Sequence, residues 1–397
     1  MSGAFDGTFV LDFTAMMAGP YCTRLLADLG ADVVKIEAPS GDHLRGRPPL
    51  RDGHSAYFGS LNCGKRSMCV DLRTSAGRAL VRRLAETADV IVENFRPGVM
   101  GRLGLDYETV RQRNPALVYC SISGFGQQGR QASRAAYAPI VHAASGYDLA
   151  LIEYQDSVAR PLKTGIFVAD VLAGALAFGA ISAALLRRRS SGCGENIDLS
   201  LMDAMFSLMP YECVAAQFPV ERQRPLYPPV RAVDGFFTVA PVSDKNFDAL
   251  ALAVGHPEWR EDPRFSTAEA REHHWPILMA LVETWASVRT VVECEKALSE
   301  AGVPCSRYFT VTEAIRSEYA EERGAFATVA DQAGTFSIPQ TPFKLVNGVA
   351  RARSWVAELG EHTEEIVTQR LGLDKQEVAN LFNEGVLFGW KESSRCE

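Results

Sequence analysis

The first third of the chain alternates between short, nearly continuous apolar runs and amphipathic segments. The apolar runs have the character of buried strands and lie at residues 9–13, 32–36, 67–72, 89–92 and 116–121. The amphipathic segments predict helices at residues 21–29, 75–87 and 107–112. This alternation is typical of an α/β domain in which helices cover both faces of a mostly parallel sheet. Ligands of such domains gather at the carboxyl ends of the strands.

The longest apolar run covers residues 171–186 and holds only small or apolar residues. A helix of this length would span about 24 Å, which is short of the ~30 Å hydrocarbon core of a bilayer. The run therefore predicts a buried helix and no membrane span. Its alanines and its glycines, Gly174 and Gly179, leave little side-chain bulk, so another helix or backbone could approach closely.

Asp170 lies directly before this run, and two interpretations compete for it. Aspartate is a preferred N-cap, because its oxygens accept hydrogen bonds from the N–H groups of the first helical turn. Spacing alone favours this cap. Alternatively, the helix dipole and the small neighbouring residues would keep the carboxylate ionised and accessible, as a carboxylate nucleophile requires. The roles exclude each other, since a fully hydrogen-bonded cap is a poor nucleophile.

A proline-rich, polar break follows the helical segment 201–217 and indicates a domain boundary. The large domain would comprise residues 1–220. A small α+β domain would comprise residues 221–325, with a strand at 236–241 and several amphipathic helices. The last part, 326–397, would form a linker and C-terminal helices that return to the large domain.

Composition and charge exclude several classes of protein. The 397 residues are 47% hydrophobic and 22% charged with a formal net charge of −7, which is ordinary for a globular protein and argues against a nucleic-acid-binding face. The nine cysteines form no C-x-x-C pair and the seven histidines lack the spacing of ligands, so neither disulfides nor a metal site is predicted. No signal-peptide pattern is present at the N-terminus, and a cytoplasmic location is expected.

A glycine-rich segment follows one predicted strand. Residues 124–129 match G-x-G-x-x-G, but neither an apolar helix nor an acidic strand end follows them. The segment therefore predicts a turn and not a dinucleotide site. Gly124, Phe125 and Gly126 remain candidates for close backbone contact with a ligand.

Two basic groups also lie beside predicted strands. The members are Asn62, Cys63, Gly64 and Lys65 before one strand, and Asn94, Phe95, Arg96 and Arg102 after another. Backbone N–H groups with lysine and arginine at strand ends suit the phosphates of a nucleotide-like cofactor. A solvated surface loop is the alternative for both groups.

These segments together resemble CoA-transferase family III, which includes formyl-CoA transferase, carnitine CoA-transferases and, as a divergent branch, the α-methylacyl-CoA racemases. The matching motifs lie in order at residues 11–20, 29–37, 62–67, 92–98, 124–126, 262–265 and 359–363. The resemblance implies a Rossmann-like large domain, a small domain and an interlocked homodimer. It also implies that Asp170 is the nucleophile, and that coenzyme A is bound by both basic groups and Tyr137.

The chain departs from the family pattern at several positions. Met17 and Ala38 replace a glutamine and an arginine that contact CoA in the family, so those contacts are not expected. Residues 242–245 replace the glycine-rich loop of the oxalate enzymes, which argues against oxalate. Tyr137 stands where the racemase branch has a catalytic histidine, and His142 is out of register. Because a racemase needs a proton acceptor on each face of the α-carbon, CoA transfer is preferred and an α-carbon racemase or epimerase is the alternative.

The acyl donor and the acceptor acid are the least explicit part of the sequence. Similarity to dicarboxylate-using members of the family implies succinyl-CoA as donor and a small dicarboxylate such as itaconate, malate or glutarate as acceptor. Arg45 and Arg47 lie in an arginine-rich loop, residues 43–51. If this loop faces the acyl end of the CoA site, one guanidinium could bind the second carboxylate bidentately. A solvated loop or a dimer contact is the alternative.

Overall fold

The computed structural model describes residues 2–155, 160–161, 164–218 and 225–390. The chain forms two compact units. The large unit comprises residues 1–214 and 321–397, and the small unit comprises residues 215–320. The domain boundary placed at 220 from the sequence lies outside the described residues.

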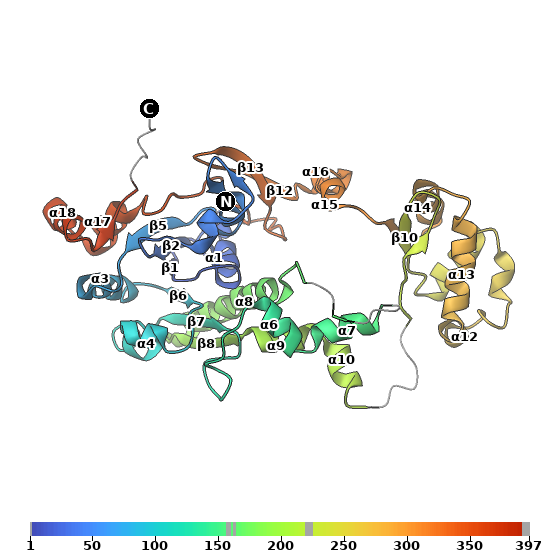
Figure 1. Ribbon diagram of the computed structural model, residues 1–397, viewed down its shortest axis with the longest axis horizontal. Helices are drawn as coiled ribbons and strands as arrows, with labels where there is room; N and C mark the ends of the chain where they lie inside the picture. The colour runs from blue at the N-terminus through green and yellow to red at the C-terminus, as the bar shows by residue number, and fades with distance from the viewer. Residues whose placement is uncertain (1, 156–159, 162–163, 219–224, 391–397) are drawn as a thin grey trace. The chain divides into compact units, whose positions relative to one another are not determined.

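A seven-stranded sheet forms the centre of the large unit, in the order β14-β5-β2-β1-β6-β7-β8 (Figure 1). Its strands are β1 (Phe9–Asp12), β2 (Asp32–Glu37), β5 (Arg66–Val70), β6 (Val90–Glu93), β7 (Val118–Ser123), β8 (Glu195–Ser200) and β14 (Leu387–Phe388). Neighbouring strands from β5 to β8 pair in parallel, whereas β14 pairs with β5 in antiparallel orientation. The predicted α/β class with a mostly parallel sheet is confirmed.

Helices cover both faces of this sheet, because its strands carry apolar side chains on both sides. Phe9 and Leu11 of β1 belong to one core, and Val10 between them belongs to the other. The first core is closed by α3 (Ser75–Ala85), α4 (Val99–Leu103), α5 (Tyr107–Val110), α17 (Thr363–Leu371) and α18 (Lys375–Asn383). The second core is closed by α1 (Ala18–Asp28), α6 (Ala138–Ala144), α8 (Val168–Ser191) and α9 (Leu201–Leu208).

Helix α8 is longer than the apolar run that predicted it. Its 24 residues span about 36 Å, so the length argument against a membrane span was wrong. Within the described residues it is the one helix long and apolar enough to cross a membrane, and a core helix of a soluble protein can have the same length and composition. Ala169, Ala173 and Ile181 are buried in the second core. A Cβ at Gly174 would lie 2.5 Å from the carbonyl oxygen of Ala18, so α1 makes the predicted close approach there.

Shorter elements lie between and after the main strands of the large unit. Between β2 and β5 lie the 3-10 turn η1 (His43–Gly46), the hairpin of β3 (Leu50–Arg51) and β4 (His54–Ser55), and α2 (Ala56–Asn62). Helix α7 (Tyr147–Glu153) follows α6, α16 (Glu318–Arg323) re-enters the large unit, and β12 (Phe326–Asp331) pairs with β13 (Gly334–Pro339). The single helix predicted at 201–217 is divided into α9 and α10 (Pro210–Ala215), because Pro210 has no N–H with which to continue α9.

The small unit has its own α+β core. An antiparallel sheet in the order β11-β10-β9 is made of β9 (Val230–Arg231), β10 (Phe236–Val239) and β11 (Cys305–Arg307). Its helices are α11 (Asp244–Ala253), η2 (Pro257–Arg260), α12 (Ala268–His273), α13 (Trp275–Ala286), α14 (Val291–Glu300) and α15 (Val311–Ala314). Phe237, Phe247 and Phe265 are fully buried among them.

Candidate active site

A cavity of about 810 Å³ lies in the large unit beside the carboxyl ends of β1, β6 and β7. Residues that follow these strands line it, together with the η1 segment and the starts of α6 and α8. They include Met16, Met17, His43, Arg47, Tyr57, Asn94, Phe95, Arg96, Gly124, Tyr137, Phe167 and Asp170. The position agrees with the rule that ligands of parallel α/β sheets bind outside the carboxyl ends of the strands.

Asp170 is the third residue of α8 and lines this cavity. Phe167 occupies the N-cap position, so the interpretation of Asp170 as the cap was wrong. Among the described residues no side chain pairs with the Asp170 carboxylate, and burial raises its pKa to about 6. A half-buried carboxylate without a hydrogen-bond partner, in the first turn of a long helix, keeps its lone pairs available for chemistry.

Tyr57 and Met17 lie on the same cavity wall. The Tyr57 hydroxyl donates a hydrogen bond to Met17 Sδ at 3.2 Å. Burial raises the pKa of Tyr57, and the negative charge of Asp170 raises it further. Tyr57 is therefore a neutral neighbour of the carboxylate, and this wall of the cavity brings no cation to Asp170.

Asn94 holds the loop that follows β1. Its Nδ2 donates to the carbonyl oxygen of Ala15 at 2.7 Å, and its Oδ1 accepts from the N–H of Ala15 at 2.9 Å. The next residue, Met16, has a φ of 66°, which is uncommon for a residue with a side chain. Both polar atoms of the Asn94 amide thus act inside the protein, where they fix the segment that presents Met16 and Met17 to the cavity.

His142 joins α6 to the start of α8, a role that the sequence did not reveal. Its Nε2 accepts a hydrogen bond from the backbone N–H of Ala169 at 3.0 Å, and the side chain is fully buried. Burial lowers the pKa of His142, and the opposing effect of Asp148 is smaller. The bond joins residues 27 positions apart, so only the fold brings them together.

Comparison with known proteins identifies the family. The family model described as CoA-transferase family III matches residues 5–363 of this chain. The chain belongs to CoA-transferase family III. The succinate–glutarate CoA-transferase of Agrobacterium fabrum is 33% identical over 387 residues, covering 92% of this chain and 95% of its own length. The succinyl-CoA–D-citramalate CoA-transferase of Chloroflexus aurantiacus is 33% identical over 393 residues, covering 95% of this chain and 96% of its own length.

Two further relatives support the assignment. The formyl-CoA:oxalate CoA-transferase of Streptomyces avermitilis is 31% identical over 417 residues, covering 98% of this chain and 100% of its own. A CAIB/BAIF family protein from Brucella suis has a solved structure with a TM-score of 0.79 and 32% identity, covering 93% of this chain and all of that one. The protein is therefore a CoA-transferase that uses CoA thioesters, and the racemase alternative is not favoured.

The first basic group does not line the cavity. Asn62, Cys63 and Lys65 are buried, each with 2% or less of its surface exposed, and none lines the cavity. The Gly64 N–H donates to the carbonyl oxygen of Trp355 at 2.8 Å. Their polar groups are engaged inside the protein, which argues against the predicted binding of CoA by these four residues.

Lys65 illustrates the reason. Its Nζ donates to Asp12 Oδ2 at 3.0 Å, to the carbonyl oxygen of Pro20 at 3.0 Å and to Asn62 Oδ1 at 2.9 Å. Three protons of an ammonium group are thereby used, which leaves none for a phosphate.

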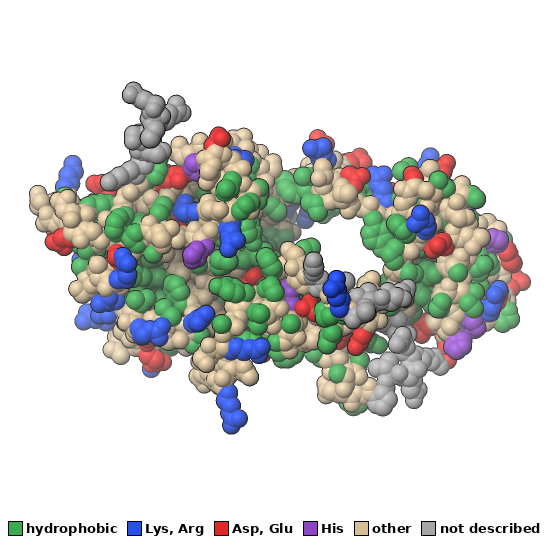
Figure 2. All heavy atoms as spheres, in the orientation of Figure 1, with side chains coloured by type: hydrophobic (Ala, Val, Ile, Leu, Met, Phe, Trp, Pro, Cys, Tyr) green, Lys and Arg blue, Asp and Glu red, His purple; other side chains and the backbone are tan. Residues whose placement is uncertain are grey.

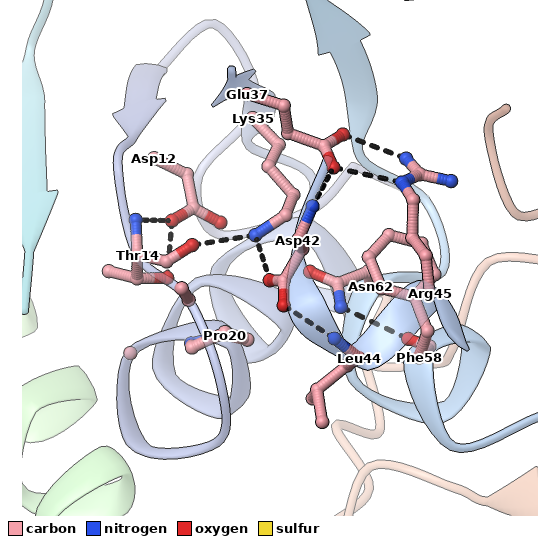
Figure 3. Close-up of polar contacts among 12 residues, drawn as sticks. Asp12, Thr14, Pro20, Lys35, Glu37, Asp42, Leu44, Arg45, Phe58 and Asn62 are labelled. Carbon is pink, nitrogen blue, oxygen red and sulfur yellow. Dashed lines mark hydrogen bonds and ion pairs between the residues drawn. The ribbon is translucent and has the colours of Figure 1, made fainter. Parts of the chain in front are cut away.

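Arg45 is also engaged within the protein. Its guanidinium makes two hydrogen bonds to the Glu37 carboxylate, at 2.8 and 2.7 Å (Figure 3), and lies 4.0 Å from the centre of the Phe58 ring. A buried carboxylate already occupies its bidentate face, which argues against the predicted role of Arg45 in substrate binding.

Two contacts of Asp42, close to the Arg45–Glu37 pair, fix the start of η1. Lys35 forms an ion pair with Asp42 at 3.0 Å, and the Asp42 carboxylate accepts from the N–H of Leu44 at 2.9 Å (Figure 3). The turn therefore has a fixed start. Arg47 follows it, and this arginine is exposed and lines the cavity with Asp170.

The remaining predicted residues are divided between the cavity and its surroundings. Phe95, Arg96, Tyr137 and Gly124 line the cavity, whereas Phe125, Gly126 and Arg102 do not. Arg102 is exposed on α4. Figure 2 shows basic side chains gathered on the visible face of the large unit over α3 and α4.

Proposed function

We propose that this CoA-transferase moves CoA from succinyl-CoA to a small dicarboxylic acid, with Asp170 as the covalent nucleophile. The observation that carries the proposal is the Asp170 carboxylate in the first turn of α8, on the wall of the large cavity, where no described side chain pairs with it. The relatives named for succinate, glutarate and citramalate support the choice of substrates. The oxalate relative also uses a dicarboxylate, of shorter length.

The reaction divides into four displacements at carbonyl carbons. The Asp170 carboxylate attacks the thioester, the C–S bond breaks, and an acyl aspartyl anhydride and CoA thiolate form. The thiolate attacks the aspartyl carbonyl, which releases the donor acid and gives an aspartyl-CoA thioester. The acceptor carboxylate displaces the thiolate from that thioester and forms a second anhydride. Attack of the thiolate on the acceptor carbonyl gives the new acyl-CoA and restores Asp170.

A panel of acceptor acids with succinyl-CoA tests the assignment directly. Incubation with succinyl-CoA alone, followed by digestion and mass spectrometry, should show a covalent mass increase on the peptide that contains Asp170. Transfer without any such adduct, under conditions that trap thioesters, would reject the covalent route.

The raised pKa of Asp170 predicts an acid limb in the pH profile. The unliganded carboxyl group titrates at a pKa of about 6, because burial disfavours its charge. As the pH falls through that value Asp170 takes up a proton and loses its nucleophilic form, so kcat/KM should fall about tenfold per pH unit or more steeply. The measurement is kcat/KM for succinyl-CoA from about pH 4.5 to 8.5. A profile that stays flat down to about pH 4.5 would contradict this role.

Arg47 is proposed to bind the second carboxylate of the acceptor. It is the member of the predicted pair that lines the cavity with Asp170, since Arg45 is bound to Glu37. Arg47→Ala should lower kcat/KM for glutarate. The loss of transition-state stabilisation should be about 1.5–3 kcal/mol, the scale of a charge-assisted hydrogen bond. Arg47→Lys keeps the charge but loses the bidentate geometry, so it should recover part of this loss.

The matched acceptor for this test is pentanoate, which has the chain length of glutarate and one carboxylate. Arg47→Ala should leave its weak use unchanged. Equal losses with glutarate and pentanoate would show that Arg47 does not recognise the second carboxylate.

Arg96, Tyr137 and the backbone at Gly124 are proposed to contact CoA, with Arg102 at its phosphate end. Their support is the shared cavity for Arg96, Tyr137 and Gly124, and the basic surface over α4 for Arg102. Phe95 contributes an apolar wall. Asn94 supports the site through Ala15.

A homodimer is proposed as the functional assembly, interlocked as the family resemblance implies. The large unit leaves apolar side chains near α8 uncovered: Ile166, Leu176 and Leu186 are 78%, 41% and 67% exposed. Such residues favour burial in an interface. Light scattering on the purified chain measures the mass. The cytoplasmic location stays a prediction.

A further inference from the structure

Helix α8 begins without a cap of its own. Phe167 at the N-cap position makes no side-chain hydrogen bond, and the first-turn N–H of Ala169 donates to Nε2 of His142 at 3.0 Å instead. His142 belongs to α6, so this bond joins the two helices whose first residues, Ala138 and Asp170 among them, line the cavity. The bonded N–H is one residue from Asp170.

The hydrogen bond requires one ionisation state of His142. Because Nε2 accepts, the imidazole is neutral and carries its proton on Nδ1. Nδ1 is buried and has no partner among the described residues. A proton added at Nε2 would turn this atom into a donor that faces the N–H donor of Ala169, so the hydrogen bond would be lost. The added charge would also be a buried cation.

The surroundings of His142 offer little to stabilise such a cation. The Tyr147 ring of α7 lies 5.3 Å from the imidazole. The acidic groups on the elements packed against α6 are Asp148 and Glu153 of α7, Asp170 of α8 and Asp203 of α9. Asp148 favours the cation, but burial opposes it more strongly and lowers the pKa of His142.

We propose that neutral His142 is a positioning residue for CoA transfer: it holds the first turn of α8, and hence Asp170, at the cavity through the Ala169 N–H, and it releases this turn when it takes up a proton from solvent. The inference rests on the nucleophilic role proposed for Asp170. His142 itself touches neither the substrate nor the transferred group.

Two substitutions separate the hydrogen bond from simple packing. His142→Gln places an amide oxygen about where Nε2 lies and restores an acceptor that does not titrate. His142→Leu fills similar space without an acceptor. We expect the glutamine variant to acylate Asp170 from succinyl-CoA within about threefold of the wild-type rate, and the leucine variant to be at least about tenfold slower, as expected for a displaced nucleophile. Rapid-quench mass spectrometry of the Asp170 peptide measures both rates.

The pH profile provides a readout that a packing role would not change. In the wild type both Asp170 and His142 must be unprotonated, so log kcat/KM should approach a slope of two once the pH lies below the pKa of both groups. In His142→Gln only Asp170 titrates, and the slope should be one. Nitrogen NMR of histidine-labelled protein should show one imidazole, absent from the variant, as the neutral tautomer protonated at Nδ1.

Equal acylation rates in the leucine variant and the wild type, or a slope of one in both the wild type and His142→Gln, would overturn the inference. If the leucine variant does not fold, the slopes and the tautomer decide. The proposed function fails separately, when the wild type gives no adduct on Asp170. A normal wild-type adduct with an unchanged leucine variant rejects only the positioning role.

Discussion

Asp170→Asn is expected to lower CoA transfer by at least about a thousandfold, because the amide cannot form the anhydride on which both half-reactions depend. The side chain keeps its size, and Phe167 rather than Asp170 occupies the N-cap position, so the start of α8 should be preserved. Both the overall transfer rate and the covalent adduct from succinyl-CoA should be lost. The assay is the initial rate of glutaryl-CoA formation.

The same substitution should stabilise the fold. The pKa of Asp170 is about 6 in the folded protein and about 3.8 when exposed, so burial of the charged form costs up to ~3 kcal/mol at neutral pH. The unfolded state loses its proton first as the pH rises, so this cost grows between about pH 4 and 6 and is constant above. Asp170→Asn removes it. Thermal unfolding of the variant should therefore occur several degrees higher at pH 7.5, with the difference vanishing near pH 4.

The chain offers a matched control in Asp203, which is the third residue of α9 as Asp170 is of α8, and which is exposed. Asp203→Asn should retain normal transfer and gain no stability. An Asp170→Asn variant that transfers CoA at a near-normal rate would end the nucleophile proposal. Loss of activity together with loss of stability would show instead that Asp170 supports the fold.

The parallel sheet could be predicted because its strands are buried on both faces. β1, β2 and β6 therefore appear in the sequence as nearly continuous apolar runs, which few other structures produce. β8 escaped prediction, since Glu195–Ser200 lies at the edge of the sheet and exposes alternate polar residues. The division of α9 from α10 was also missed, although Pro210 gives the signal in the sequence.

The site was predicted only in part, for a different physical reason. Family motifs located Asp170, Arg96 and Tyr137, and these residues line one cavity. A lysine before a strand, however, has the same sequence signature whether it binds a phosphate or a buried carboxylate. Lys65 binds Asp12, whose position 53 residues earlier no local pattern discloses. His142 was missed likewise, because its partner is a backbone N–H.

Lys65→Met is expected to destabilise the large unit by about 3–5 kcal/mol at pH 7, the cost of leaving one partner of a buried ion pair uncompensated. Asp12 is completely buried; it accepts from the Thr14 N–H at 2.9 Å and from the Thr23 hydroxyl at 2.6 Å, besides Lys65. Burial alone would raise the pKa of Asp12, but Lys65 and then Lys35 outweigh it and lower that pKa to about 2. Methionine fills similar space and removes the direct cation.

The dependence on pH distinguishes an unpaired charge from lost packing. In the wild type the depressed pKa of Asp12 contributes stability that is present above its unfolded pKa of about 3.8 and lost as the pH falls toward 2. Without Lys65 the pKa of Asp12 should rise, so the variant's deficit relative to the wild type should shrink from pH 7 to about pH 5. Urea unfolding at both values measures the deficit.

A second substitution completes the test of the buried pair. Asp12→Asn with Lys65→Met removes both charges, and this double variant should be more stable at pH 7 than Lys65→Met alone, because no buried carboxylate is left without its cation. Arg73→Met is the control, since Arg73 pairs with Asp71 while 87% of its side chain is exposed, and it should change stability little. A Lys65→Met deficit that is independent of pH and not relieved by Asp12→Asn would assign the effect to packing around Pro20 and Asn62. The observed contacts favour an effect of charge, because all three polar contacts of Lys65 are hydrogen bonds from its ammonium group to oxygen atoms, and methionine cannot donate any of them.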